Sequence, residues 1–428
     1  MSELSYLGKL LDGVEVEWKM LGEVIHSLKT GLNPRQNFSL NTLDAQGYYV
    51  TVREIQNGKV VFLDKTDRVN DRALKIINGR SNLEAGDILF SGTGTVGRIA
   101  VIEENPINWN IKEGVYTIKP IKEKIAPRFL SYLLQSSKIV KDYSKKIVGN
   151  PVISLPMGDL KKLLIPIPCP GNPEKSLAIQ AEIVRILDKF TALTAELTAE
   201  LTAELSMRKK QYNHYRDLLL SFEEGEVEWK TLGEMGTLIR GKRFVKADII
   251  PKGVPCIHYG EMYTHYSIWA NRAKSYISVE LASKLRKASC GDVVFVSAGE
   301  TIADIGRGTA WLGDEDVVIH DACFFYKSSL NPKYVAYFSR TNFFHDQIKK
   351  SISSGKISAI NAKGFEKVII PVPSPEEQAR IVAFLDKFDT LTSSITEGLP
   401  REIELRQKQY EYYRDLLFSF PKPETASN

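Results

Sequence analysis

The chain has 428 residues, which exceeds the size of one compact hydrophobic core and predicts two or more domains. Hydrophobic residues make up 43% and charged residues 25% of the sequence, a composition that excludes a disordered chain. The net charge of +5 is compatible with a nucleic-acid partner but does not require one. The amino terminus lacks a basic region followed by an apolar stretch, and no apolar run approaches the roughly 20 residues of a membrane span. We therefore expect a cytoplasmic protein without a membrane partner.

Residues 1–173 are predicted to form a first, mostly β domain. Residues 86–90, Gly-Asp-Ile-Leu-Phe, are typical of a turn that enters a buried strand, and a loop rich in Gly and Thr follows them. Residues 164–168, Leu-Ile-Pro-Ile-Pro, predict a closing strand with a proline-stiffened exit.

Residues 174–225 are predicted to form a helical spacer, with a long helix over 174–222. Apolar residues recur there at steps of three and four. Thr-Ala-Glu-Leu occurs three times in succession over 194–205. Because four residues advance about 400° around an α-helix, the leucines should form a slanting apolar seam that requires a partner helix. The seam comprises Leu193, Leu197, Leu201 and Leu205.

The rest of the chain repeats this order. Residues 226–375 predict a second mostly β domain, and residues 376–428 predict a second helical segment, which Gly398 and Pro400 should interrupt. The repeated pairs are 15–19 with 226–230, 187–190 with 385–388, and 215–219 with 413–417. The sequence between these segments is not repeated. We therefore predict an α+β protein. Its two mostly β domains, residues 1–173 and 226–375, differ in sequence and are called the first and second heads below. They are separated by two long antiparallel helical segments and related by a pseudo-two-fold internal repeat.

Several motifs suggest catalysis but are better explained as structure. Residues 90–97 contain F-x-G-x-G and G-x-G-x-x-G, yet the residues that follow predict a strand rather than the helix that a cofactor site needs. Residues 331–334, Asn-Pro-Lys-Tyr, predict a capped helix start rather than an adenine-binding motif. Residues 236–243 mimic a phosphate-binding loop, but Arg243 replaces the Ser or Thr that would coordinate magnesium. His320 and Cys323 lie too close in sequence to converge as a catalytic pair.

The four cysteines are widely spaced and form no C-x-x-C pair, so neither a disulfide framework nor a zinc ribbon is expected. Cys256, His258 and His265 could hold a metal, but they lack a second close pair of ligands. Ordinary strand and loop positions are the favoured interpretation. We predict that the chain binds no metal and performs no catalysis.

These features resemble the specificity subunit of type I restriction-modification enzymes. The likeness rests on the two variable heads, the repeated helical segments, the Gly-Asp-Ile-Leu-Phe turn and the Ile-Pro-Ile-Pro exit. The Thr-Ala-Glu-Leu array is similar to that of the IC subgroup. The resemblance implies that each head is a target recognition domain reading one half of a bipartite, asymmetric sequence in double-stranded DNA. The helices would set the spacer length and dock the modification subunits.

The same resemblance implies a division of chemistry among subunits. Two modification subunits would use S-adenosylmethionine to methylate adenine, and two restriction subunits would use ATP and Mg for translocation and cleavage. This chain would hold no cofactor of its own.

Candidate DNA contacts are basic, acidic, hydroxyl and amide side chains in the unrepeated loops, because phosphate contacts set register and base-edge contacts specify sequence. In the first head they are Arg35, Arg53, Ser91, Thr93, Thr95, Arg98, Lys145, Lys146 and Asn150. In the second head they are Arg240, Lys242, Arg243, His258, Tyr259, Ser297, Glu300, Thr301, Lys356 and Asn361.

Two other functions fit parts of the sequence. A self-contained DNA adenine methyltransferase would use residues 90–94 and 331–334, and it would bind S-adenosylmethionine as an isolated chain. A coiled-coil adaptor that binds no DNA would use the heads to bind protein. DNA binding measured across salt concentrations separates these functions, because phosphate contacts impose a steep salt dependence.

Overall fold

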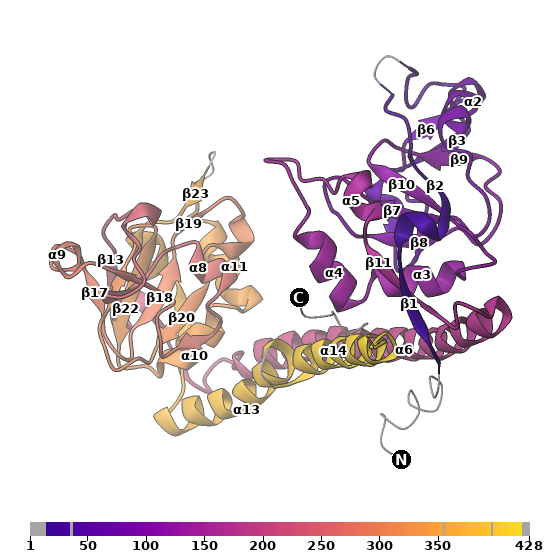
Figure 1. Cartoon of the computed structure of the whole chain (residues 1–428). Helices are drawn as coiled ribbons and strands as arrows, with labels where there is room; N and C mark the ends of the chain where they lie inside the picture. Colours follow the sequence, from indigo (N-terminus) through magenta and orange to yellow (C-terminus); the bar gives the residue numbers. More distant parts are fainter. Residues whose placement is uncertain (1–13, 35–36, 354, 356, 395–396, 422–428) are drawn as a thin grey trace. The chain divides into compact units, whose positions relative to one another are not determined.

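The computed structural model describes residues 14–34, 37–353, 355, 357–394 and 397–421 (Figure 1). The chain divides into two compact units: unit 1 contains Met1–Ala199 and Glu404–Asn428, and unit 2 contains Glu200–Ile403. Each unit therefore combines one β-rich head with helical segments from both halves of the sequence. The mixture of helices and strands confirms the predicted α+β class. Within the described residues, none of the helices has the length and apolar character needed to cross a bilayer.

The head of unit 1 contains an antiparallel sheet with the strand order β2-β10-β7-β8. In a second sheet, β3 pairs antiparallel with β6 and parallel with β9. The strands are β1 (Val16–Met20), β2 (Ile25–Thr30), β3 (Gly47–Val50), β4 (Ile55–Gln56), β5 (Lys59–Val60), β6 (Arg68–Val69), β7 (Ile88–Ser91), β8 (Ile99–Val101), β9 (Trp109–Ile111), β10 (Val115–Pro120) and β11 (Leu164–Pro168). The helices of this head are α2 (Asp71–Arg80), α3 (Pro127–Leu134), α4 (Ser137–Ser144) and α5 (Met157–Lys161).

The head of unit 2 contains a five-stranded sheet, β13-β22-β18-β20-β15, and a four-stranded sheet, β16-β14-β21-β17. The strands are β12 (Glu228–Thr231), β13 (Gly236–Arg240), β14 (Val254–Ile257), β15 (Trp269–Ala270), β16 (Ser275–Ile277), β17 (Lys287–Ala288), β18 (Val293–Val296), β19 (Ala298–Gly299), β20 (Gly308–Trp311), β21 (Val317–Ile319), β22 (Cys323–Ser328), β23 (Ser358–Ala359) and β24 (Ile369–Val372). The helices are α7 (Leu232–Met235), α8 (Glu261–Thr264), α9 (Val279–Ala282), α10 (Pro332–Phe338), α11 (Asn342–Lys349) and α12 (Ala362–Glu366).

A repeated two-stranded sheet connects the beginning and the end of each head. β1 pairs antiparallel with β11 and places Trp18 opposite Pro166. β12 pairs with β24 in the same way and places Trp229 opposite Pro371. Proline lacks the N–H that an interior strand donates to its neighbours, so it is confined to edge strands such as these two-stranded pairings. The predicted closing strands are thus confirmed.

The helical segments largely match their predicted bounds. α6 (Pro173–Leu219) is continuous and begins where Asn172 accepts a hydrogen bond from the backbone of Lys175 at 3.0 Å. The second segment forms α13 (Pro375–Ser393) and α14 (Leu399–Leu417), which confirms the predicted interruption. Gly398 adopts φ +87°, and Pro400 lies in the first turn of α14, where its missing N–H has no helical acceptor to lose.

The helices share the apolar core of each head. In unit 1, Ile183 and Leu187 of α6 pack in one cluster with Leu417 and with the head residue Phe129. In unit 2, Ile381 and Leu385 of α13 pack with Leu220 and the core of the second head. Leu187 and Leu385 are fully buried, and each such burial contributes about 1.5–3 kcal/mol. The predicted leucine seam is only partly buried, because Leu193 remains 51% exposed.

Candidate nucleic-acid interface

A buried glutamine from each repeat fixes its head on the helices. In unit 1, Gln180 accepts a hydrogen bond from the backbone N–H of Ala126 at 2.8 Å and donates to the carbonyl of Lys124 at 3.0 Å. In unit 2, Gln378 accepts from the N–H of Asn331 at 2.9 Å and donates to the carbonyl of Pro373. The two glutamines therefore hold the residues that precede α3 and α10.

An aspartate further along each helix makes a second matched contact. Asp188 accepts hydrogen bonds from Arg128 at 2.9 Å and from the hydroxyl of Tyr132 at 2.7 Å. Asp386 accepts from Lys333 at 2.8 Å and from the hydroxyl of Tyr337 at 2.7 Å. Burial raises the pKa of Tyr132 to about 12 and, together with Asp386, raises the pKa of Tyr337 well above its ordinary value. Both hydroxyls therefore stay protonated and donate at neutral pH.

The repeated Tyr-Arg-Asp-Leu-Leu segments close each unit from the opposite helix. In unit 1, Asp415 accepts a hydrogen bond from the first N–H of α4, on Ser137, at 2.9 Å, and Tyr413 stacks on Phe190 with ring centroids 5.3 Å apart. In unit 2, Asp217 accepts from the amide of Asn342 at the start of α11 at 2.9 Å. The helix pairs run antiparallel within each unit, as predicted. The repeated sequence thus supplies the attachment of each head.

The unrepeated loops of the first head meet at the Gly/Thr loop, residues 92–97. Thr93 lies within hydrogen-bond distance of Ser154, whereas Thr95 is exposed. Ser91 was predicted to contact DNA, but its side chain is fully buried, donates to the carbonyl of Thr95 and accepts from the N–H of Arg98. The prediction for Ser91 is corrected: it shapes the loop from within. Gly92 is required, because a Cβ there would lie 2.0 Å from the ring of Tyr116.

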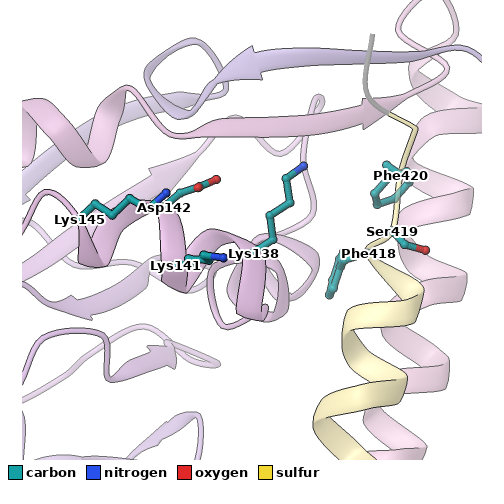
Figure 2. A pocket seen from close by; sticks show the side chains of 7 residues that line it. All are labelled: Lys138, Lys141, Asp142, Lys145, Phe418, Ser419 and Phe420. Carbon is teal, nitrogen blue, oxygen red and sulfur yellow. The ribbon is translucent and has the colours of Figure 1, made fainter. Parts of the chain in front are cut away.

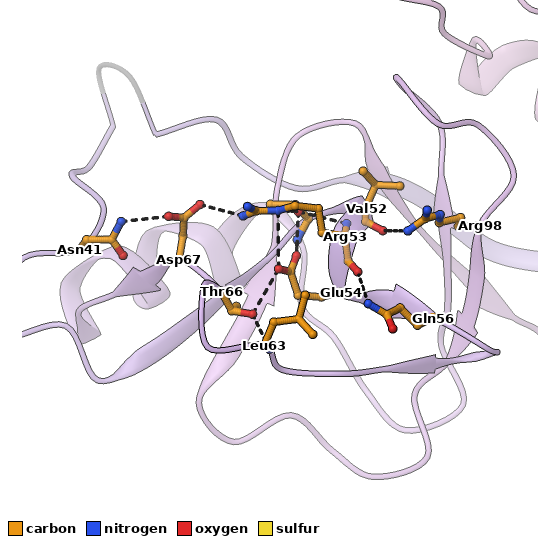
Figure 3. Close-up of polar contacts among 10 residues, drawn as sticks. Asn41, Val52, Arg53, Glu54, Gln56, Leu63, Thr66, Asp67 and Arg98 are labelled. Atoms are coloured by element: carbon orange, nitrogen blue, oxygen red, sulfur yellow. Dashed lines mark hydrogen bonds and ion pairs between the residues drawn. The ribbon is translucent and has the colours of Figure 1, made fainter. Parts of the chain in front are cut away.

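Two predicted arginines of the first head are engaged in a polar network (Figure 3). Arg53 donates to Asp67 at 3.4 Å and lies beside the fully buried Glu54. Arg98 donates to the carbonyl of Val52 at 3.1 Å. About half of the Arg53 side chain remains exposed (52%), so its guanidinium retains a face for a phosphate. Arg35 lies outside the described residues.

Three basic candidates of the second head follow one another at the end of β13. Arg240, Lys242 and Arg243 are all exposed. Arg240 donates to the carbonyl of Asp321 at 2.9 Å, and Lys242 donates to the carbonyl of Lys284 at 2.9 Å. These bonds hold residues 240–243 beside the ends of β13 and β21, so the three positive charges lie close together there.

An aromatic cluster adjoins this basic segment. The ring centroids of His258 and His320 are 4.6 Å apart, and those of Tyr259 and His320 are 5.1 Å apart. Burial lowers the pKa of both histidines below the ordinary value, so both are neutral at physiological pH. The Nδ1 atom of His258 accepts from the N–H of Gly260 at 3.3 Å, which leaves Nε2 as the donor. Tyr259 is 38% exposed.

The remaining second-head candidates divide between surface and scaffold. Glu300 and Thr301 are exposed after β19. Ser297 is 3% exposed, and its backbone pairs with Ile360, so the prediction of a DNA contact at Ser297 is corrected. The side chain of Asn361 accepts from the N–H of Gly364 at 2.9 Å and caps α12, which makes it first a structural residue. Lys356 lies outside the described residues.

An open groove of about 440 Å³ in unit 1 separates α4 from residues 418–420 (Figure 2). Lys138, Lys141 and Asp142 of α4 and Lys145, which directly follows the helix, line one side of the groove, opposite Phe418 and Phe420. The Lys138 ammonium lies 3.6 Å from the ring centroid of Trp18, a cation–π contact. Three lysines against one aspartate make this side of the groove net positive, and α4 leads directly into residues 145 and 146, which were predicted to contact DNA.

The local structures predicted for residues 92–97 and 331–334 are confirmed. The loop at 92–97 connects β7 to β8, two antiparallel strands, rather than a strand to a helix. Asn331 caps α10 by accepting from Lys333 and Tyr334, with proline in the first turn. Gly236–Arg240 is strand β13. Among the residues that the structure describes, no three His, Cys, Asp or Glu side chains are grouped to hold a metal.

Comparison with known proteins decides the family. The model of the type I restriction modification DNA specificity domain matches residues 14–207 and again residues 224–405. The chain belongs to this family. The Escherichia coli EcoR124I/EcoR124II specificity subunit is 39% identical, with 100% of each chain covered. The Escherichia coli EcoprrI specificity subunit is 35% identical over 93% of each chain. A chain from a solved type I R-M system covers 94% of this chain and 97% of its own length, with TM-score 0.61 and 19% identity, which shows a shared fold.

Sequence reasoning placed Asn150 among the DNA contacts but missed the apolar part of the hairpin at residues 147–155. Its tip carries the exposed apolar side chains Val148, Val152 and Ile153. The sequence signal was a run of apolar residues around Gly149 and a proline, placed directly after two lysines. Such residues are ordinarily assigned to a core, and this hid them.

Proposed function

We propose that this chain is the DNA-recognition subunit of a type I restriction-modification complex and that each head reads one half of a bipartite, asymmetric target. One observation carries the proposal. The same contacts, from Gln180 and Asp188 in unit 1 and from Gln378 and Asp386 in unit 2, attach both heads. The loops outside those contacts share little sequence. A scaffold repeated in this way suits one ligand type with two different halves.

The family makes the chain a non-catalytic component that assembles with modification and restriction subunits on DNA. We infer two copies of each partner, since the two units offer matched helical surfaces. In the proposed complex, S-adenosylmethionine belongs to the modification subunits, and ATP and Mg belong to the restriction subunits. The complex would act in the cytoplasm. The self-contained methyltransferase is not supported, because the relatives are specificity subunits.

The helical segments are proposed to set the spacer between the two half-sequences. The Thr-Ala-Glu-Leu array over 194–205 lies inside the continuous helix α6, where the two units divide between Ala199 and Glu200. Each four-residue Thr-Ala-Glu-Leu repeat contributes about 6 Å of helix. This is comparable to one or two base-pair steps of roughly 3.4 Å.

Each half-sequence is proposed to be read by loop residues of one head. In the first head, Thr95, Arg98, Lys145, Lys146 and Asn150 are the proposed DNA contacts, and in the second they are Arg240, Lys242, Arg243, His258, Tyr259, Glu300 and Thr301. Arg53 and Thr93 are proposed as supporting contacts. A correct bidentate base contact contributes about 1–3 kcal/mol of discrimination.

Methylation mapping tests the assignment. The chain is assembled with its modification subunit, and the methylated sequence is determined genome-wide for the unaltered chain, for Thr95→Ala with Arg98→Ala, and for Arg243→Ala with Tyr259→Ala. The first pair should relax one half-sequence and the second pair the other. A single pair that relaxes both halves contradicts the assignment of one head to one half. Methylation of DNA by the purified chain alone would refute the non-catalytic role.

A further inference from the structure

Exposed apolar side chains lie at the 147–155 hairpin of the first head and beside the bridge between Ser353 and Ala359 in the second head. In the first head, Val148 is 57%, Val152 61% and Ile153 40% exposed. In the second head, Ile357 is 63% exposed and lies between the bridged residues Ser353 and Ala359. Exposed apolar side chains gathered at one projection are unfavourable unless a partner covers them. Their presence in both heads, whose loops otherwise differ, points to a shared use.

The base of each hairpin is held by the same backbone bonds. Val148 and Ser154 exchange backbone hydrogen bonds at 2.8 and 2.7 Å, and Leu155 donates to the carbonyl of Gly92 at 2.8 Å. In the second head, Ser353 and Ala359 exchange bonds at 2.9 and 3.1 Å, and the N–H of Ile360 donates to Ser297 at 2.9 Å. The two hairpins are therefore structural equivalents.

The first hairpin is also fixed by side chains. The hydroxyl of Tyr116 donates to the carbonyl of Leu155 at 2.8 Å, and the hydroxyls of Thr93 and Ser154 lie 3.2 Å apart. Gly149 adopts φ +110°, and a Cβ there would lie 2.2 Å from the carbonyl of Val152. The apolar tip is thus held in one conformation before any partner binds, which lowers the entropy cost of binding.

The charge around the hairpin identifies the partner. Lys145 and Lys146 directly precede it, and Lys138 and Lys141 lie on the face of α4 that leads to it. A DNA duplex offers phosphates to the lysines and base surfaces to the tip, and the family of this chain is a DNA specificity domain. Apolar side chains inserted in a DNA groove commonly accompany such phosphate contacts.

We propose that the 147–155 hairpin enters a groove of the DNA and packs Val152 and Ile153 against the bases of the half-sequence read by the first head, while Lys145 and Lys146 bind the flanking phosphates. Ile357 performs the same role in the second head. This inference rests on the proposed function and adds a salt-independent, apolar component to recognition.

The test separates the apolar from the ionic contribution. The complex with its modification subunit is titrated with a duplex that carries the mapped methylation target, at several salt concentrations. Val152→Ser with Ile153→Ser should weaken binding roughly tenfold to hundredfold at every salt concentration, without changing the slope. Lys145→Gln with Lys146→Gln should reduce the slope of log affinity against log salt by roughly 0.9 for each phosphate that the variant no longer binds.

Three further variants control for shape, for unrelated apolar surface and for the other head. Val152→Ile with Ile153→Val keeps an apolar tip and should retain binding. Ile107→Ser removes an apolar side chain that is 98% exposed elsewhere in the first head and should leave affinity unchanged. Ile357→Ser should weaken binding independently, so that its effect adds to that of the first pair.

Each outcome supports or overturns a defined statement. If the unaltered complex shows no salt-dependent binding to the duplex, the proposed function itself fails. If the unaltered complex binds but Val152→Ser with Ile153→Ser binds equally well, or loses affinity no more than Ile107→Ser, the hairpin inference alone is overturned. A variant that releases the modification subunit while keeping DNA affinity also overturns it, because the tip would then be a protein contact.

Discussion

Replacing either buried glutamine by alanine should destabilise one unit and leave the other unchanged. Gln180 and Gln378 are 0% and 4% exposed, so truncation leaves the backbone groups that they bind without a partner inside the protein. In each case these groups are one N–H and one carbonyl. An unsatisfied buried polar group costs about 1–3 kcal/mol. Since water can enter the space left by the side chain and recover part of this loss, we expect about 2–4 kcal/mol for each variant.

Hydrogen exchange of the full chain, resolved by mass spectrometry, measures the effect in each unit separately. Gln180→Ala should reduce protection in α3 and its neighbours in unit 1 by roughly thirtyfold or more, and Gln378→Ala should do the same around α10 in unit 2. Gln211→Ala provides the control, because this glutamine is exposed on the same helix as Gln180 and should change stability by less than about 0.5 kcal/mol. The reasoning is refuted if Gln180→Ala lowers protection equally in both units, or if its effect does not exceed that of Gln211→Ala.

Two other perturbations test the spacer and the second head. Deleting residues 202–205 should shorten α6 by about 6 Å, so methylation mapping should reveal a shorter spacer between unchanged half-sequences; altered half-sequences with the original spacer would contradict this. Acidification should destabilise the second head, because burial lowers the pKa of His258 and His320 and the unfolded chain then binds more protons. The contribution of the two neutral histidines to the stability of the second head is complete above about pH 6.5 and is lost as the pH falls below that value. Hydrogen exchange at pH 7 and pH 5.5 would detect this loss. His258→Gln with His320→Gln should remove this part of the pH dependence, and unchanged acid sensitivity in that variant would exclude the histidines as its source.

The repeated segments could be predicted from the sequence because their physical constraints are local. The apolar spacing of Ile183 and Leu187 indicated a helix face, and the proline pairs indicated the exit strands. The start of α10 followed from Asn331 and the proline after it, since an amide cap and a proline in the first turn favour only that structure. These expectations required no knowledge of the tertiary contacts.

The candidate site was less predictable, because exposure depends on tertiary packing. Ser91 and Ser297 sit at the ends of apolar strands and were predicted to contact DNA, yet both are buried: Ser91 bonds within its own loop, and the backbone of Ser297 pairs with Ile360. Arg53 was expected to be a DNA contact, but no sequence signal indicated that Asp67 and Glu54 would be its partners. Conversely, no sequence signal indicated that Val152 and Ile153 would be exposed, because apolar residues usually enter a core.

The contacts that attach the first head are separate from its proposed DNA contacts, and this separation affects how specificity can change. Gln180 and Asp188 attach the head through α3 and the residues before it, and none of the proposed DNA contacts takes part in those bonds. A substitution at Thr95 or Arg98 therefore leaves the attachment intact, while a substitution at Gln180 removes stability without addressing any base. Surface changes of the first kind usually alter stability by less than about 0.5 kcal/mol, whereas each correct base contact contributes about 1–3 kcal/mol of discrimination. The fold consequently allows one half-sequence to be changed with little loss of stability in the head and without altering the other half.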